Sequence, residues 1–525
     1  MATLASIKSP GVYIQEMPSG SRPIEGVGTA IAAFIGVTAD GPYNAVTKVT
    51  NWTQYTTTFG GWVDGAYTPH AIYQYFNNGG GACYVCRIGM DGSGTPAPRA
   101  SAELTSSAKA GQAIFRIEAR DDGDGDEKIS VTVLTESTDL PEGQEGGEAA
   151  PGKGEQTVTV MVQGRGIEEK YEKVGGRRGR NDLATMLQNS ALVHAVEVGN
   201  ASVAERVPAT GEVVLSGGAA LPATLSPNDY IGDEAARSGI AGLTAIDEVT
   251  MVLTPDLMAA YEAGQMDSDG VRAVQNAVIL HCETMKNRMA ILDTPKGLNA
   301  QQVQEWVTEK AKFSSAYAAI YWPWPSFWDP AAKRARLMPP SGALAGIWGR
   351  VDDTRGVHKA PANEVVGGAL DLELAVTRPE HDSLNPVGIN VIRAFTGRGI
   401  LVWGARTLAS DPAWRYINVR RLFNFIESSI LGGTQWAVFE PNELDLWQRL
   451  KRTVKAFLLG LWRDGALFGA TPDEAYYVKC DAETNPPDVI DAGFVVIEVG
   501  IAPVKPAEFV VFRISQLPTG GGVEE

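Results

Sequence analysis

The feature that most constrains the fold is a regular alternation of short apolar segments with long amphipathic ones, from Asp229 onwards. The apolar runs have the length of strands, and the periodic segments between them have the length of helices. The expected strands are Val249–Leu253, Met289–Asp293 and Ala318–Tyr321, and the expected helices between them are Asp269–Arg288 and Ala300–Ser314. Because strands joined by helices of this length run parallel, the alternation predicts an α/β core with a parallel-type sheet and helices on its faces.

The same alternation is expected near the N-terminus, with strands at Ala30–Val37 and Ala82–Ile88 and a helix at Pro69–Phe76. It is interrupted between residues 92 and 228, where acidic, glycine-rich runs separate short strand-like pieces. We interpret this stretch as a β-rich domain inserted into the core, with mobile loops. Its Asp121–Asp126 run imitates part of a calcium loop, but no downstream glutamate is placed to complete one.

The last section contains two helices, Trp414–Leu431 and Glu443–Arg463, followed by two apolar strands, Gly493–Ile501 and Phe509–Ile514. The link between these strands contains two prolines and is longer than a tight hairpin turn. Two arrangements stay open. The strands form a wide hairpin, or the last strand leaves its own domain and adds to the sheet of a neighbouring subunit.

A second isolated strand, at the N-terminus, favours donation to a neighbour. Val12–Glu16 lies between Ser9-Pro-Gly and Pro18 and is too isolated to fold alone. If each subunit gives strands to the next, the contact is heterologous and generates an open helical assembly. The residues expected in the two arm strands are Val12, Tyr13, Ile14, Phe509, Val510, Val511, Phe512 and Ile514.

Charge and composition exclude several classes of protein. The net charge of −17 over 525 residues argues against a nucleic-acid partner, because phosphate contacts need a basic face. No run is long enough to cross a bilayer, and residues 1–21 lack a signal-peptide pattern. Four cysteines in this length are no disulfide framework. We therefore expect a protein of the cytoplasm of the producing bacterium, without direct membrane contact.

No residue pattern indicates catalysis. Ser341 lies in Pro-Pro-Ser-Gly without a nucleophile elbow, and no phosphate-binding Gly-x-x-x-x-Gly-Lys loop is present. Cys83 and Cys86 have a zinc-like spacing, but residues three apart on a strand point to opposite faces. Two metal alternatives are left open, a remote site with His281 and Cys282, and calcium bound by the Asp121–Asp126 run. We expect no catalytic residue, no metal site and no cofactor.

Motifs along nearly the whole chain, apart from about residues 92–227, resemble the tail sheath proteins of contractile phage tails and related contractile injection systems. The longest are Pro339–Arg350 (PPSGALAGIWGR), Lys359–Asn363, Leu384–Asn390 and Gly397–Leu408. Further matches follow in order: Ser9–Tyr13, Trp322–Pro325, Trp414–Phe423, Phe439–Asn442, Trp462–Ala470 and Gly500–Pro503. One such match is weak, whereas all of them in order are a strong signal.

The resemblance implies a mechanical polymer and not an enzyme. Sheath subunits form a six-fold helical homo-oligomer around an inner tube, with baseplate and cap or terminator proteins as further partners. The family's central domain is subtilisin-like, and it is expected here as a fold without that chemistry. Since no nucleotide site is present, the energy of contraction has to be stored at assembly, as the difference between two packings of one chain.

The expected α/β multidomain architecture joins this subtilisin-like core to the insertion and to an α+β C-terminal domain with strand-exchanging arms. The division is 1–22, N-terminal linking arm; 23–91, first part of the core; 92–228, inserted β-rich outer domain; 229–408, subtilisin-like domain; 409–504, tube-facing C-terminal domain; and 505–525, C-terminal linking arm.

Helix Glu443–Arg463 combines an apolar stripe with basic residues that fall mostly on its other side. A solvated face is the plain interpretation. In a sheath this domain faces the tube, which makes the cations candidates for binding acidic tube residues: Arg449, Lys451, Arg452 and Lys455. Two alternatives to a sheath remain, a subtilisin-like hydrolase and a static, non-contractile filament protein. The sequence does not distinguish a phage, a bacteriocin and a cellular injection system.

Overall fold

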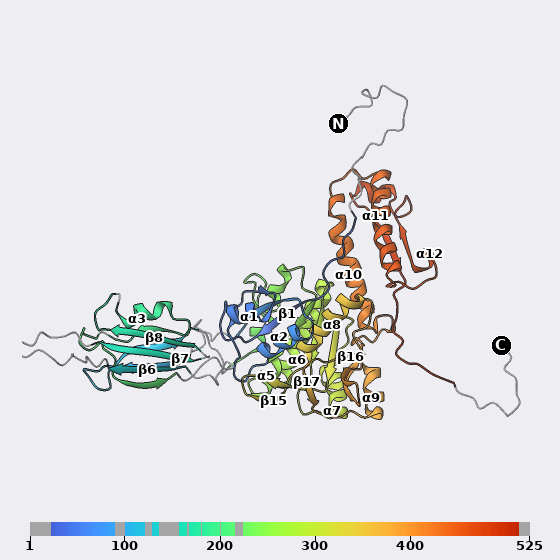
Figure 1. Cartoon of the computed structure of the whole chain (residues 1–525). Coiled ribbons are helices and arrows are strands. Elements are labelled where there is room, and N and C mark those ends of the chain that lie inside the picture. The colour runs from blue at the N-terminus through green and yellow to red at the C-terminus, as the bar shows by residue number, and fades with distance from the viewer. Residues whose placement is uncertain are drawn as a thin grey trace, which may run out of the picture. The chain divides into compact units, whose positions relative to one another are not determined.

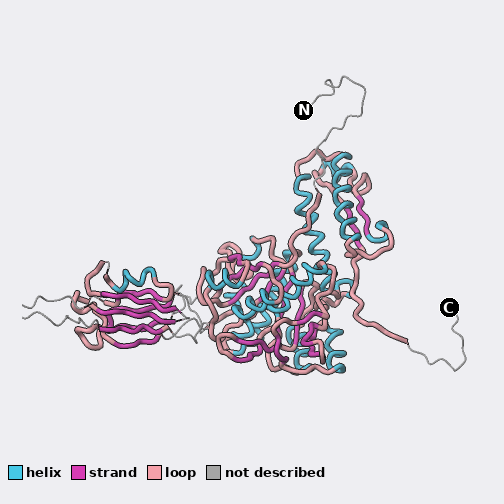
Figure 2. Tube along the Cα trace, viewed as in Figure 1, coloured by secondary structure: helices cyan, strands magenta, loops and turns pink. Residues whose placement is uncertain are grey.

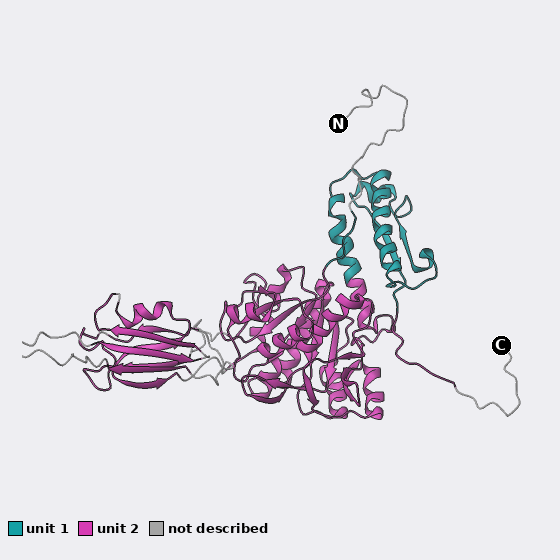
Figure 3. Ribbon diagram, in the orientation of Figure 1, with its two compact units in different colours: residues 1–27, 425–504 teal, residues 28–424, 505–525 magenta. Residues whose placement is uncertain are grey.

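The computed structural model describes residues 23–89, 100–120, 129–135, 157–164, 167–179, 181–199, 201–215 and 224–513. The chain divides into two compact units (Figure 3). Unit 1 comprises residues 1–27 and 425–504, and unit 2 comprises residues 28–424 and 505–525. Helix α10 (Ile417–Thr434) belongs to both units.

The core of unit 2 is a nine-stranded sheet, of which Figure 1 labels β1 and β16. The strand order is β16-β19-β18-β13-β12-β11-β1-β3-β2. The six strands from β18 to β3 run parallel, and β2, β19 and β16 are antiparallel to their neighbours. This agrees with the parallel-type sheet expected from the alternating pattern. The bounds are β1 (Ile31–Gly36), β2 (Thr47–Val49), β3 (Ala82–Arg87), β11 (Met251–Leu253), β12 (Met289–Asp293), β13 (Ala318–Trp322), β16 (Glu364–Val365), β18 (Ile389–Phe395) and β19 (Gly399–Val402).

Both faces of this sheet are covered, since every residue of β11, β12 and β13 is buried. Helices α2 and α8 pack on each other and on the central strands, and α5 and α6 pack on each other and on the same strands. The helices are α1 (Trp52–Phe59), α2 (Thr68–Asn77), α4 (Pro227–Ile231), α5 (Asp256–Glu262), α6 (Ser268–Met285), α7 (Ala300–Glu305), α8 (Ser341–Arg355) and α9 (Arg378–Leu384). Short 3₁₀-helices lie at Ala241–Ala245, Asn385–Val387 and Pro412–Trp414. A small sheet joins β15 (Arg334–Leu337), β14 (Pro325–Asp329) and β17 (Ala369–Leu372).

One helix differs from its expected form. The pattern predicts a single helix over Ala300–Ser314, but α7 changes at Trp306 into a π-helix that ends at Ala311. The extra residue per turn of the π-helix keeps Trp306, Val307 and Ala311 buried. Over so few residues, the spacing of apolar side chains does not distinguish an α-helix from a π-helix.

The inserted stretch has a hydrophobic core of its own between Leu104 and Leu215, and among its described residues only Leu225, near its expected end, belongs to the core of the main sheet. Two antiparallel sheets, in the orders β4-β5-β9 and β10-β6-β7-β8, contribute most of its buried side chains, and α3 and the turn after it add Leu183 and Leu187. Figure 2 shows how strongly strands dominate this part. Its elements are β4 (Ser101–Thr105), β5 (Ala113–Ala119), β6 (Ser130–Thr135), β7 (Val158–Gly164), β8 (Ile167–Val174), α3 (Leu183–Met186), a turn at Leu187–Asn189, β9 (Val193–Glu197) and β10 (Gly211–Val214).

Unit 1 combines helices with a two-stranded antiparallel sheet, β20-β21. Its elements after α10 are a turn at Gln435–Ala437, α11 (Leu444–Arg463), α12 (Pro472–Ala475), β20 (Tyr476–Lys479), α13 (Pro487–Asp491) and β21 (Glu498–Ile501).

The strand expected over Gly493–Ile501 is therefore too long, because its first half has other hydrogen-bond partners. The Asn485 side chain donates to the carbonyl of Val496 and accepts from its N–H, and Asn442 donates to the carbonyl of Phe494. These side-chain amides satisfy the backbone that would otherwise enter a sheet.

Candidate functional site

Ser341, the serine that a subtilisin-like enzyme would need to expose, is completely buried at the start of α8. Its hydroxyl donates to Asp293 Oδ2 at 2.6 Å, and its N–H donates to Asp293 Oδ1 at 3.0 Å. Burial raises the pKa of the Asp293 carboxyl to about 7, although both hydrogen bonds lower it. No described hydrogen bond brings to this pair the histidine that a Ser-His-Asp arrangement uses as its base.

The buried histidines serve packing. His70 stacks on Trp62 with ring centroids 4.5 Å apart, and its Nε2 lies 3.7 Å from Asp329. His281 Nε2 lies 3.2 Å from the Arg288 guanidinium. Burial lowers the pKa of each imidazole to about 4, so both are neutral at pH 7. Neither has a serine or cysteine nucleophile among its described hydrogen-bond partners.

A side chain of the protein fills the place where an α/β sheet of this order usually binds its ligand. That place lies beyond the carboxyl ends of β1 and β11, where the strand order reverses. The fully buried Asp256 carboxylate accepts hydrogen bonds there from the N–H groups of Val37, Tyr67 and Thr68, at 2.6, 2.5 and 2.9 Å. It thereby occupies the anion position at the start of α2.

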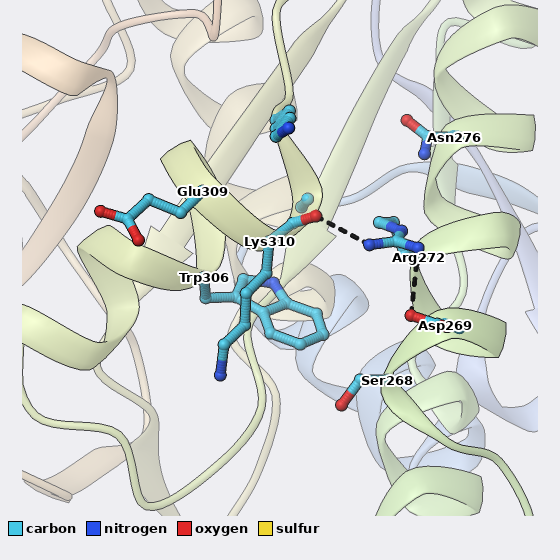
Figure 4. A pocket seen from close by; sticks show the side chains of 9 residues that line it. Ser268, Asp269, Arg272, Asn276, Trp306, Glu309 and Lys310 are labelled. Carbon is cyan, nitrogen blue, oxygen red and sulfur yellow. Dashed lines mark hydrogen bonds and ion pairs between the residues drawn. The ribbon is translucent and has the colours of Figure 1, made fainter.

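A polar pocket of about 350 Å³ lies between the first turns of α6 and the π-helix (Figure 4). Arg272 crosses it, donating to the Lys310 carbonyl at 2.9 Å and pairing with Asp269 at 3.0 Å. The indole of Trp306 lies on the π-helix side, with Glu309 nearby (Figure 4). Arg272 is thus held by the protein itself, and the lining contains neither a histidine nor a cysteine.

The four cysteines are buried and free. Cys83 and Cys86 lie on β3, and burial raises the pKa of Cys86 to about 11 and that of Cys282 to about 12. Thiols with pKa values this high stay protonated at pH 7. Among the residues that the structure describes, no three His, Cys, Asp or Glu side chains gather as metal ligands, and no helix is long and apolar enough to span a membrane.

The four cations proposed on the basic helix have different surroundings on α11. Arg449 pairs with Glu440 at 3.0 Å and Asp445 at 3.1 Å, and its guanidinium lies 5.2 Å from the Trp436 ring. Lys451 is half-buried. Arg452 and Lys455 are exposed and make no ion pair with a described residue. The expected apolar stripe is buried at Trp447, Leu450, Val454 and Leu458 and half-buried at Phe457 and Leu461.

The predicted arm strands lie only partly within the described residues. Val12, Tyr13, Ile14 and Ile514 are outside them. Four consecutive apolar residues are between 71% and 84% exposed and pair with no described strand: Phe509, Val510, Val511 and Phe512. Such a run is unusual on a surface and has the character of an unpaired contact segment.

The sequence pattern did not predict the residue that holds this segment. Glu508 accepts hydrogen bonds from Arg406 Nε at 2.9 Å, Arg406 Nη2 at 2.5 Å and Asn385 Nδ2 at 2.8 Å. Arg406 lies 102 residues away in the chain, so no local periodicity connects the two. A lone glutamate beside two prolines carries no signal that could have identified it.

Comparison with known proteins agrees with this picture. Residues 243–408 match the model of the phage tail sheath protein central domain, and residues 409–516 match that of the phage tail sheath C-terminal domain. The tail sheath protein of Vibrio phage KVP40 is 26% identical over 301 residues, covering 54% of this chain and 42% of the relative. That of Enterobacteria phage T4 is 27% identical over 216 residues, covering 40% and 32%. The chain thus aligns with less than half of the length of either relative.

Solved structures match along nearly the whole chain. The helical sheath of the anti-feeding prophage in its contracted state is 25% identical, with a TM-score of 0.57, covering 97% of this chain and 99% of that one. The PVC sheath complex, an extracellular contractile injection system in its contracted state, is 23% identical with a TM-score of 0.58, covering 97% and 98%. The mixed α/β fold is that of sheath proteins. The chain belongs to the phage tail sheath family.

Proposed function

We propose that this chain is the structural subunit of a contractile tail sheath. It polymerises helically around an inner tube on a baseplate, then shortens once and drives the tube through a target envelope. The observation that carries the proposal is the match, over 97% of the chain, to a helical sheath solved in its contracted state. The particle is assembled in the cytoplasm of the producing bacterium as part of a phage tail or a tail-like particle.

The proposal includes no enzymatic activity. The family is structural, and its subtilisin-like core keeps here the sheet and the helices without the chemistry. Ser341 bonded to Asp293, and Asp256 in the ligand position of the sheet, support this. If the hydrolase alternative held, purified protein would cleave peptides and Ser341→Ala would abolish cleavage. We expect no cleavage by either.

Strand exchange through the arms is the proposed linkage between subunits. The β20-β21 sheet of unit 1 supports it, because an isolated two-stranded sheet is marginal and both outer edges lack a partner among the described strands. Its surface carries exposed apolar side chains at Tyr477 and Val499. We infer that this sheet receives the strands Val12–Glu16 and Phe509–Ile514 from neighbouring subunits.

Electron cryomicroscopy of particles, made by co-expressing the chain with its tube and baseplate, tests function and linkage together. We expect six-fold tubular sheaths in which both arm strands extend β20-β21 of other subunits, and a shorter, wider form after contraction. Discrete globular particles with both arms folded onto their own chain would contradict the proposal. A single lattice that never shortens would favour the static filament.

The tube contact is proposed on α11, with Arg452 and Lys455 as the principal cations and Lys451 beside them. Arg449 takes a lesser part, because its guanidinium already binds Glu440 and Asp445. Cations that face acidic tube residues guide assembly through complementary charge.

Reversing these charges tests the contact. Arg452→Glu/Lys455→Glu should fold normally, because both side chains are exposed, but should prevent sheath growth on the tube. Pelleting with purified tubes and negative-stain counting of sheathed tubes measure this. The control Lys109→Glu/Lys333→Glu makes the same charge change at two exposed lysines outside α11 that make no ion pair with a described residue, and it should grow normally. Unchanged co-assembly of the α11 variant would remove α11 as the tube contact.

A further inference from the structure

The chain passes between the two units three times, at residues 27/28, 424/425 and 504/505 (Figure 3). Close to each passage, on the unit 2 side, a residue is held by one of two clusters built from an arginine and a carboxylate. Thr29 follows the first passage, Arg421 precedes the second, and Glu508 follows the third. All partners described below also belong to unit 2.

The first cluster joins two of these passages to α8. Arg421 Nη1 and Nη2 bind the two oxygens of Asp352 at 2.8 and 2.5 Å, with both side chains below 5% exposed. Arg421 also donates to the Thr29 carbonyl at 2.9 Å, and the Thr29 hydroxyl donates to Asp352 Oδ2 at 2.6 Å. The guanidinium lies 4.8 Å from the ring centre of Trp348. A bidentate pair of this kind fixes position as well as distance.

The second cluster holds the third passage. Besides Arg406 and Asn385, Glu508 accepts a hydrogen bond from the Tyr416 hydroxyl at 3.2 Å. Arg406 is 8% exposed and donates to the Asn385 carbonyl at 3.0 Å, so it is itself oriented. The residues on either side of Glu508, Ala507 and Phe509, are exposed. One carboxylate is therefore the point where this segment is attached to the core before the exposed run 509–512.

We propose that these two clusters are clamps through which force enters the core. A pull on unit 1 reaches the core at Thr29 and Arg421, and a pull on the segment after Glu508 reaches it at Arg406. Buried ion pairs add little net stability over apolar packing, but breaking one partner is costly, which suits a positional role. The mechanical consequence rests on the proposed sheath function, whereas the clamping itself does not.

Spin-label mobility in the purified full-length chain tests the clamping. The native cysteines are buried, so Gly28→Cys or Ala507→Cys adds one accessible thiol beside a clamp. Both nitroxides should be restricted in the parent chain. Glu508→Gln should increase the mobile fraction at 507 about tenfold and leave 28 unchanged, and Asp352→Asn should do the reverse. Glu234→Gln, an exposed carboxylate with the same charge change, should alter neither.

If Asp352→Asn fails to fold, Thr29→Val removes one hydroxyl of the same cluster and should still release the label at 28. Parent labels that are already mobile, or an unchanged spectrum at 507 in Glu508→Gln, would overturn the clamps.

The force role is tested separately in assembled sheaths. Glu508→Gln should assemble but break into segments on contraction, and a sheath as intact as the parent would overturn that role. A chain that never forms a sheath would refute the proposed function while leaving the label result standing.

Discussion

At the scale of single residues, two buried carboxylates stand where a related α/β fold would hold a ligand or a catalytic group. Asp256 follows β11, and Asp293 is the last residue of the neighbouring strand β12. Asp256 accepts from two N–H groups at the start of α2, and Asp293 accepts from one at the start of α8. These are the positions where α/β proteins place ligands and catalytic groups. The protein's own side chains satisfy the helix ends, which ties the helices to the sheet.

Asp293 makes stability depend on pH. Because burial raises the pKa of its carboxyl to about 7, the folded state holds this proton more tightly than the unfolded state, where the pKa is about 4. The stability that the protonated Asp293 carboxyl contributes is therefore present at acid pH and is lost as pH rises from about 4 through about 7. Between pH 5 and pH 8 the thermal midpoint of Asp293→Asn should fall less than that of the parent. The difference should be about 2–4 °C for each kcal/mol of unfolding free energy that ionisation of Asp293 removes from the parent. Parallel curves in calorimetry would show that Asp293 ionises freely.

At the scale of elements, the motif Pro339–Arg350 has a packing reason. Helix α8 crosses α2 so closely that a methyl group at Gly342 would overlap the Ala71 carbonyl, and one at Gly346 would overlap the Tyr75 carbonyl. The same helix carries Trp348, which is fully buried and donates to Tyr321 at 3.0 Å. Gly342 and Gly346 let α8 approach α2 closely, and Trp348 packs on the side of α8 that contacts the sheet strand β13.

Gly346→Ala should therefore destabilise the core by about 1–3 kcal/mol, because the overlap is with backbone and not with a movable side chain. Urea unfolding measures the change. Gly460→Ala is the matched control, because its added methyl group meets nothing within 4 Å in helix α11. The control should gain about 0.5–1 kcal/mol from helix propensity. Equal stabilisation of both variants would show that α2 and α8 separate without cost.

At the scale of the whole molecule, the chain is a set of parts with separate cores. The inserted stretch buries its own residues, including Phe115, Val131, Val160 and Leu187, and the main sheet buries another set. Unit 1 has a smaller cluster around Trp447 and Cys480. Separate cores allow one part to vary while the others keep their structure.

The inserted domain should accordingly fold alone. A fragment of residues 100–215 should give a β-type circular dichroism spectrum and a single cooperative thermal transition, because its apolar side chains are satisfied within it. The remaining chain, closed by a short flexible linker, should still form sheaths. A fragment that is unfolded in isolation would mean that the main core supports it.

The sequence by itself determined the elements and the family. Apolar periodicity and its interruptions located most strands and helices, and the bounds of β12 were predicted to the residue. This is possible because the burial of one face, or of a whole strand, produces a pattern among residues that are near one another in the sequence. Motifs in order identified the sheath family. What only the tertiary structure decided are the contacts between distant segments: Asp293 with Ser341, Asp352 with Arg421, and Glu508 with Arg406. The orientation of a buried carboxylate depends on which backbone and side-chain donors the fold brings to it, and no local pattern encodes that approach.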